Sequence, residues 1–293
     1  MSLFDNTQFA FESKSDKDLK KAYYLYKLIG SPALTSFGTK FFNLPFAVDI
    51  PFVKPVIRET IYKQFVGGET AEQGVVVANE LFKYHVSSIL DYSIEGLTEE
   101  KQFDEVRDVM LHLVDLAKSN QSIPFVVFKP TAFGRIELFE KVGKKQTLTA
   151  EEEKSWANIR QRFEAVCQKG YDLDVNIMVD AEETWMQGSA DDLTDEMMVK
   201  YNTKRALVWN TLQMYRHDRL AYLKEMHAKA EREGYFLGFK IVRGAYMEKE
   251  RARAQAEGYP SPIQPNKEAS DRDYNLALEF IASHHERFGL FAG

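Results

Sequence analysis

The segment FKIVRGAYMEKERARA, residues 239–254, joins an apolar run to a cation and a glycine turn. Ile241 and Val242 suit a buried strand, and Arg243 and Gly244 follow at its end. A cation beside a backbone that can be approached closely suits an anionic ligand at the carboxyl end of a strand. Taken alone, the segment is explained more simply as a buried strand whose last arginine extends into solvent. The rest of the chain decides between the two.

Other short apolar runs share this character, and amphipathic segments separate them. Repeated strand and helix units predict a parallel sheet with right-handed crossovers. The predicted strands are VSSILDY (86–92), PFVVFK (124–129), VNIMVD (175–180), ALVWNT (206–211), GFKIVR (238–243) and GLFAG (289–293). The predicted helices between them lie near 98–120, 149–169, 190–203, 216–233 and 268–287.

The predicted strands are apolar almost throughout, which is typical of a sheet buried on both faces. Polar side chains stand at the carboxyl ends of five different runs. An open sheet gathers its ligand at one switch point, whereas a (β/α)₈ barrel collects groups from many strand ends. We therefore expect a barrel. The polar residues at the five strand ends are Asp91, Lys129, Asp180, Gln213 and Arg243.

Residues 1–85 have a different pattern, and we expect an N-terminal helical region there and a barrel domain over 86–293. Four helices are predicted, over 16–29, 32–43, 52–65 and 70–85. Within the barrel domain, residue chemistry marks some helix ends. Thr149 and Glu152 have the spacing of a capping box, Gly234 suits a helix end, and Ser270-Asp271 suits a helix start.

Composition restricts the class of protein. The 293 residues carry a net charge of −6, which argues against non-specific binding of nucleic acid. The single cysteine, Cys167, excludes an internal disulfide and is expected to be buried and inert. The first residues do not resemble a signal peptide and no window is apolar enough to span a membrane, so we expect a cytoplasmic protein. The charged run 248–251 is expected to be a solvated helix face.

Nucleotide and metal motifs are missing. Neither GxGxxG after a strand nor GxxxxGK[ST] is present, and the six histidines form no HExxH motif. His284 and His285 are expected to be a surface pair, and Glu182 and Glu183 are expected to be first-turn acids of a helix. Asp180 ends an apolar strand, and a nearby cation such as Lys129 would offset the cost of burying it.

Together the motifs resemble the proline dehydrogenase family. The likeness begins with an approach segment, QFVGGET, and includes six motifs in order over about two hundred residues. The segments are QFVGGET (64–70), LDYSIEG (90–96), FKPTAFGR (128–135), MVDAEETWMQ (178–187), WNTLQMY (209–215), KIVRGAYMEKER (240–251) and YPSPIQPNKEASDRDY (259–274). The resemblance implies a distorted (β/α)₈ barrel with noncovalent FAD, preceded by helices. It implies oxidation of L-proline to Δ1-pyrroline-5-carboxylate, the first step of proline catabolism, with hydride transfer to the flavin and electrons passed to a quinone or other acceptor. It also leaves room for peripheral contact with the inner face of a membrane.

The resemblance also assigns roles to single residues. It implies catalytic roles for Lys129, Asp180 and Arg243, with Lys129 beside the proline carboxylate and Asp180 as its charge partner. It places Asp91 and Glu95 over the substrate. It implies contacts to FAD from Gln213, Lys240, Val242, Gly244, Ala245, Tyr246 and Lys267.

The sequence departs from the family pattern in two ways. Lys240 and Arg243 stand where many bacterial relatives have Arg and then Lys, an order closer to the eukaryotic type. Only six strands are predicted, whereas a closed barrel needs eight, and the family's final RRxxE helix is not found. We therefore expect a fragment of a longer chain, poorly soluble or flavin-deficient by itself. A degenerate barrel acting as a binding scaffold, and an enzyme for a proline analogue such as hydroxyproline, remain as alternatives.

Overall fold

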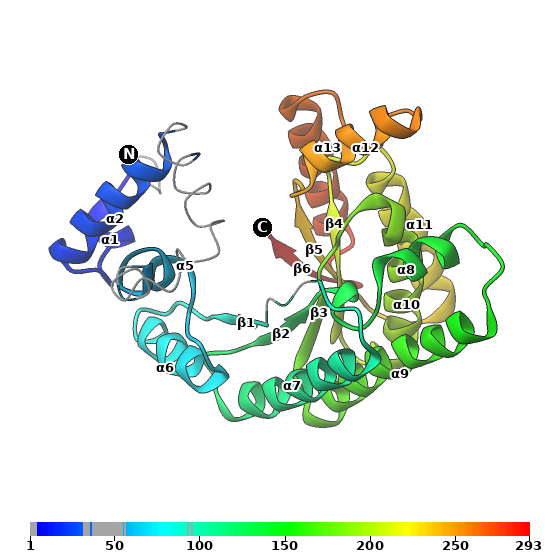
Figure 1. The fold of residues 1–293 in the computed structure, drawn as a ribbon, viewed down its shortest axis with the longest axis horizontal. Helices are drawn as coiled ribbons and strands as arrows, with labels where there is room; N and C mark the ends of the chain where they lie inside the picture. The colour runs from blue at the N-terminus through cyan, green and yellow to red at the C-terminus, as the bar shows by residue number, and fades with distance from the viewer. Residues whose placement is uncertain (1–4, 32–35, 37–54, 56, 93, 95) are drawn as a thin grey trace. The chain divides into compact units, whose positions relative to one another are not determined.

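The computed structural model describes residues 5–31, 36, 55, 57–92, 94 and 96–293 (Figure 1). The chain divides into two compact units, Met1–Ser88 and Ile89–Gly293. The described part of the first unit is helical. Its elements are α1 (Thr7–Ala10), α2 (Asp16–Ile29), the π-helical turn η2 (Arg58–Tyr62), α5 (Lys63–Phe65) and α6 (Ala71–Phe82).

These helices agree with three of the four predicted N-terminal segments, since η2 and α5 lie in the described part of 52–65. The helix predicted over 16–29 is confirmed as α2, and the one over 70–85 is confirmed as the shorter α6. Side-chain caps begin both, because Ser15 Oγ accepts from Asp18 N and Thr70 Oγ1 accepts from Gln73 N. Most of 32–43 and the start of 52–65 lie outside the described residues.

The second unit is built on a six-stranded parallel sheet in the order β1-β2-β3-β4-β5-β6. All six predicted runs contain a strand, and the predicted parallel pairing is confirmed. The strands are β1 (Ile89–Asp91), β2 (Phe125–Phe128), β3 (Asn176–Val179), β4 (Val208–Gln213), β5 (Leu237–Val242) and β6 (Phe288–Ala292).

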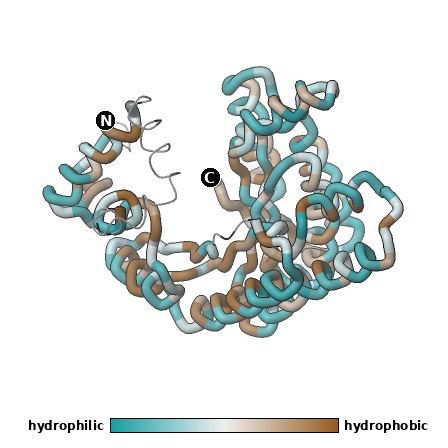
Figure 2. The backbone as a smooth tube through the Cα atoms, viewed as in Figure 1, coloured by the Kyte–Doolittle hydropathy of each residue, from teal (hydrophilic) through white to brown (hydrophobic). Residues whose placement is uncertain are grey.

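Helices connect the strands and cover one face of the sheet (Figure 1). Side chains that point to this face, such as Val179, Leu212 and Phe239, are fully buried. In Figure 2 hydrophobic residues concentrate along the strands, whereas much of the helical surface is hydrophilic. The connecting elements are α7 (Glu100–Ser119), η3 (Pro130–Ala132), α8 (Ile136–Gly143), α9 (Ala150–Leu173), α10 (Thr184–Tyr201), α11 (Arg219–Glu233), α12 (Met247–Glu257) and α13 (Lys267–Ser283).

The other face of the sheet has a small apolar core at the amino-terminal half of the strands. Trp209 packs there with Val127 and Met178. Gly238 and Gly289 flank it on β5 and β6, where a Cβ atom would collide with the indole ring. The glycines therefore make room for the one large side chain on this face of β4. The fold is the predicted α/β arrangement of a barrel-type sheet, with β1 and β6 at its edges.

Several predicted helix boundaries need correction. The capping box at Thr149 and Glu152 and the helix end at Gly234 are confirmed. The start predicted at Ser270-Asp271 is wrong, because Asn266 caps α13 and those residues lie inside its first turns. α10 begins at Thr184 rather than 190, since polar residues are buried along it and hide the helical period.

Candidate functional site

The candidate site lies at the carboxyl ends of β2 to β5, on the face of the sheet that carries Trp209. Side chains alternate along a strand, so Thr211 and Gln213 point to the same face as Trp209. Lys240 and Val242 occupy the paired positions on β5. This face therefore changes from apolar at the start of the strands to polar at their ends.

A depression of about 430 Å³ opens at this polar end. Three cations and one carboxylate line it, so its charge suits an anionic ligand. The lining residues are Lys129, Asp180, Ala181, Thr211, Gln213, Lys240, Val242, Arg243, Gly244, Ala245, Tyr246 and Gly293. The depression thus gathers nine of the twelve residues to which the sequence assigns a role.

Asp180 forms an ion pair with Lys240, not with the predicted partner Lys129. The two side chains come from β3 and β5 and meet across β4, where Thr211 is short enough to leave room. The Thr211 hydroxyl donates to Val179 O at 2.9 Å and lies 3.4 Å from Asp180 Oδ1. In the part of the chain that the structure describes, Lys129 has no carboxylate oxygen within 4.0 Å of its amine.

Gln213 joins two loops with its amide group. Its Nε2 donates to Glu182 O at 2.8 Å, and its Oε1 accepts from Ala245 N at 3.1 Å. Between strand β5 and Ala245, Gly244 has φ +139°, and a Cβ atom there would collide with the ring of Tyr215. Glycine is therefore required where this loop borders the depression.

Arg243 and Lys267 share a carboxylate at the start of α13. Asp271 Oδ1 accepts from Arg243 Nε and its Oδ2 accepts from Lys267 Nζ, both at 2.5 Å. The hydrogen bonds from these two cations, first from Lys267 and then from Arg243, lower the pKa of Asp271. The Arg243 guanidinium also lies over the ring of Tyr274, 4.7 Å from its centroid. Lys267 itself is outside the lining of the depression.

Of the two residues predicted to lie over the substrate, the structure describes only Asp91. Asp91 ends β1 and is exposed, and it is not among the lining residues. Glu95 lies outside the described residues.

Glu182 was predicted as an ordinary first-turn acid, and this is wrong. It lies before α10, is 5% exposed, and its carboxylate accepts from both Thr131 N and Thr131 Oγ1, at 2.9 and 2.6 Å. Burial raises its pKa to about 7, although the two bonds from Thr131 act in the other direction. Glu183 is also buried and pairs with Lys249. The only sequence signal was two acids directly after a strand end.

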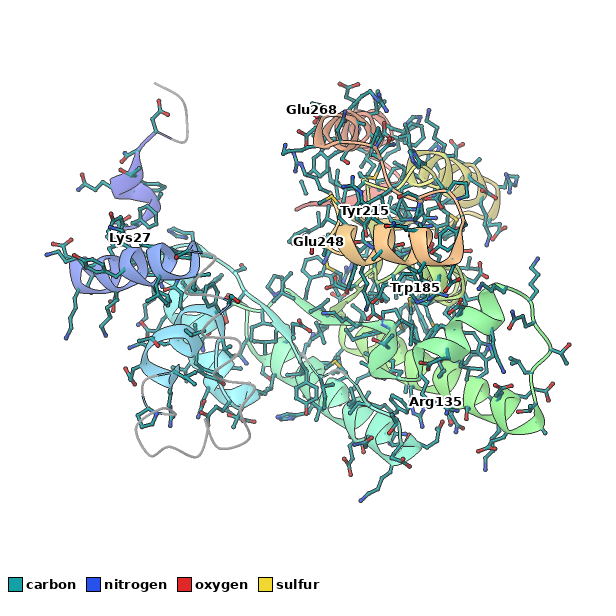
Figure 3. The ribbon with its side chains drawn as sticks, turned by 45° about the horizontal axis from the view of Figure 1, so that its top comes forward. Lys27, Arg135, Trp185, Tyr215, Glu248 and Glu268 are labelled. Carbon is teal, nitrogen blue, oxygen red and sulfur yellow. The ribbon has the colours of Figure 1, made fainter. Side chains whose placement is uncertain are left out.

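The charged run 248–251 is likewise not a uniformly solvated face. Glu250 is fully buried and accepts from Thr184 N and Thr184 Oγ1, at 2.7 and 2.6 Å. It therefore binds the first free backbone amide of α10 from a neighbouring helix. Figure 3 shows Trp185 beside α12, the helix that carries Glu248, and the Arg253 guanidinium lies 4.3 Å from the centre of a Trp185 ring.

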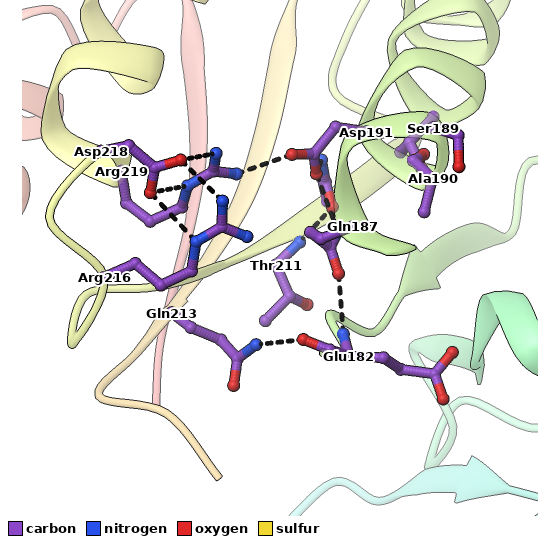
Figure 4. A network of polar contacts seen from close by, with 12 residues as sticks. Glu182, Gln187, Ser189, Ala190, Asp191, Thr211, Gln213, Arg216, Asp218 and Arg219 are labelled. Carbon is purple, nitrogen blue, oxygen red and sulfur yellow. Dashed lines mark hydrogen bonds and ion pairs between the residues drawn. The ribbon is translucent and has the colours of Figure 1, made fainter. Parts of the chain in front are cut away.

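A buried polar network lies behind the site (Figure 4). Asp191 accepts from Arg219 Nη1 at 2.6 Å, from Gln187 Nε2 at 2.8 Å and from Asn210 Nδ2 at 3.0 Å. Gln187 Oε1 in turn accepts from Glu182 N at 2.7 Å. The network thus connects α10 and α11 to the loop that follows Asp180.

The described residues form neither a membrane-spanning helix nor a cluster of metal ligands. No helix among them is both long and apolar enough to cross a bilayer. The same residues contain no group of three or more His, Cys, Asp or Glu placed to hold a metal ion. Cys167 is fully buried in α9, and burial raises the pKa of its thiol, as an inert residue requires.

Comparison with solved structures identifies the fold. The chain is similar to proline utilization A from Bdellovibrio bacteriovorus inactivated by N-propargylglycine, with a TM-score of 0.73 over 98% of this chain and 31% of that one. The sequence identity is 18%, so this likeness concerns the fold alone. It agrees with the predicted barrel-type α/β domain preceded by helices.

Comparison with known sequences identifies the family. The chain is 32% identical over 227 residues to the carbapenem antibiotics biosynthesis protein CarD of Pectobacterium carotovorum subsp. carotovorum, covering 78% of this chain and 59% of that protein. It is 35% identical over 240 residues to the mitochondrial proline dehydrogenase 1 of Caenorhabditis elegans, covering 80% of this chain and 38% of that protein. The chain thus spans less than two thirds of either relative. The family model for proline dehydrogenase matches residues 76–293, and the chain belongs to the proline dehydrogenase family.

Proposed function

We propose that this chain carries the flavin-facing part of an enzyme that oxidises L-proline to Δ1-pyrroline-5-carboxylate with FAD. The proposal rests on family membership and on one observation, the cation-rich depression at the strand ends. Family members use FAD, and the donor set here suits it. Arg243 and Lys240 supply positive charge, while Gly244 lets the backbone approach a planar ring closely.

A bound FAD would supply the hydride acceptor for oxidation of the proline ring carbon next to nitrogen. The protein's own residues bind and orient the reactants. Lys129, which has no ion pair among the described residues, is the group we assign to the proline carboxylate. Asp180 holds the Lys240 ammonium in place, and a fixed cation stabilises negative charge that develops nearby. Gln213 fixes the loop at Ala245 through its carbonyl oxygen.

Lys129→Met tests this assignment in the complete gene product. Removing the ammonium should lower kcat/KM for L-proline by roughly a hundredfold or more, mainly through KM, because a charged hydrogen bond to the substrate is lost. The measurement is proline-dependent dye reduction. Lys154→Met is the matched control, since Lys154 is exposed on α9 and away from the depression. Equal activity of the two variants would contradict the role of Lys129.

A proline analogue such as hydroxyproline is the second candidate substrate. It is favoured by a relative described as the hydroxyproline dehydrogenase of Xenopus laevis, which is 25% identical to this chain over 329 residues. The same assay with both substrates separates the candidates by their kcat/KM values. A protein that binds FAD and is reduced by neither substrate would instead be the degenerate scaffold.

The electron acceptor and the location belong to the same proposal. We propose a quinone or another diffusible acceptor, and a cytoplasmic protein with peripheral contact at the inner face of a membrane. Cosedimentation with lipid vesicles, with and without reduction by L-proline, tests the membrane contact.

A further inference from the structure

The carboxylate of Glu182 ties together two loops of the candidate site. It follows β3, and its two oxygens accept from the backbone N–H and the hydroxyl of Thr131 in the loop after β2, at 2.9 and 2.6 Å. Thr131 belongs to the short helix η3, for which Lys129 is the N-cap residue. The carboxylate therefore holds the turn that carries Lys129 against the turn that carries Asp180.

The backbone of the same residue extends this connection. Glu182 O accepts from Gln213 Nε2 on β4 at 2.8 Å, and Gln213 Oε1 accepts from Ala245 N after β5 at 3.1 Å. Loops or ends of β2, β3, β4 and β5 are thus joined in one chain of hydrogen bonds through Glu182.

The position of Glu182 is itself fixed from behind. Its backbone N–H donates to Gln187 Oε1 at 2.7 Å, and Gln187 Nε2 donates to the buried Asp191 at 2.8 Å (Figure 4). A buried carboxylate is retained only where its bonds offset the cost of desolvation. Here those bonds go to the loop of Lys129.

We propose that Glu182 is a positioning residue whose carboxylate sets the place of the Lys129 ammonium in the site; this rests on the proposed function and deepens it. Glu182 does not line the depression, so it acts through Lys129 and Gln213. A glutamine replaces one acceptor oxygen by an NH2 group, so the Thr131 hydroxyl must turn from donor to acceptor and both bonds lose the negative charge that strengthens them.

Two readouts test the proposal in Glu182→Gln. The first is kcat/KM for L-proline, which should fall roughly tenfold when the substitution is made in the wild type. When it is made in Lys129→Met, kcat/KM should fall by less than about twofold, because the effect acts through Lys129. The second is the NMR signal of the Lys129 amine after ¹³C reductive methylation of the protein. This signal is identified because it is missing in Lys129→Met, and its chemical shift should change in Glu182→Gln. Glu183→Gln is the matched control, because Glu183 is equally buried in the same turn but pairs with Lys249.

The outcomes separate this inference from the function. If Glu182→Gln lowers kcat/KM by the same factor with and without Lys129, or if its kinetics and Lys129 signal match those of Glu183→Gln, the positioning role is wrong. If the wild type is inactive while the Lys129 signal still shifts, the proposed function fails and the positioning role stands. Thr131→Val, which removes only the hydroxyl donor, replaces Glu182→Gln in both tests if that variant does not fold.

Discussion

Lys240 reaches Asp180 across β4, and the short side chain of Thr211 makes this contact possible. The sequence predicts both charged residues at neighbouring strand ends, because parallel strands place their carboxyl ends at one edge. It assigns Asp180 to Lys129, which follows the adjacent strand β2. Which of the two lysines pairs with Asp180 depends on how far each side chain reaches across the neighbouring strand. The periodicity of the strands does not contain this information.

Gly244 allows a direct test of the loop after β5. Gly244→Ala should weaken FAD binding at least tenfold, because φ +139° and the ring of Tyr215 both oppose a Cβ atom. Gly258→Ala is the control, since Gly258 also has positive φ, at +73°, but has no atom near its Cβ position. FAD titration by fluorescence measures both. Equal affinities in the two variants would contradict the role of the Gly244 loop in FAD binding.

Glu182 should make stability depend on pH. Burial raises its folded-state pKa from 4.5 to about 7, so the folded state binds more protons than the unfolded state between these values. Its contribution is then fully present below pH 4.5 and is lost as pH rises to 7, by about 3 kcal/mol at most. Urea unfolding of wild type and Glu182→Gln between pH 5 and 8 measures the difference. Parallel stability curves for the two proteins would refute the raised pKa.

At the scale of elements, α10 shows where sequence patterns fail. Its start at Thr184 is capped from outside by the buried Glu250 of α12, and ten of its side chains are buried, several of them polar. Neither feature produces an apolar stripe in the sequence, so hydrophobic periodicity predicts that α10 begins later than it does. α7 and α9 have clear apolar stripes, and their predicted starts are close to those observed.

The buried pair between α10 and α11 should matter more than exposed pairs. Asp191→Ala leaves Arg219 buried with only its bonds to Asp218, and we expect a loss of about 3–5 kcal/mol of unfolding free energy. Glu164→Ala removes an exposed pair with Lys200 and should cost at most about 1 kcal/mol. Denaturant unfolding compares the two variants. A difference below about 1 kcal/mol would mean that the network in Figure 4 adds little stability.

At the scale of the whole molecule, the fold follows from six apolar runs separated by helices, and all six are strands in the predicted parallel order. The same pattern places Lys129, Asp180, Gln213 and Arg243 around one depression, because side chains at the ends of parallel strands converge. Glu182 and Glu250 could not be identified in this way. Their roles depend on contacts between loops and helices that are distant in sequence.

The central claim is that this strand-end site serves proline oxidation with FAD, and anaerobic flavin spectroscopy tests it most directly. L-Proline is added without oxygen to the complete gene product loaded with FAD. The account predicts that the visible absorbance of the oxidised flavin disappears with L-proline and persists in Lys129→Met at the same concentration. A protein that binds FAD but keeps the oxidised spectrum with L-proline would contradict the account.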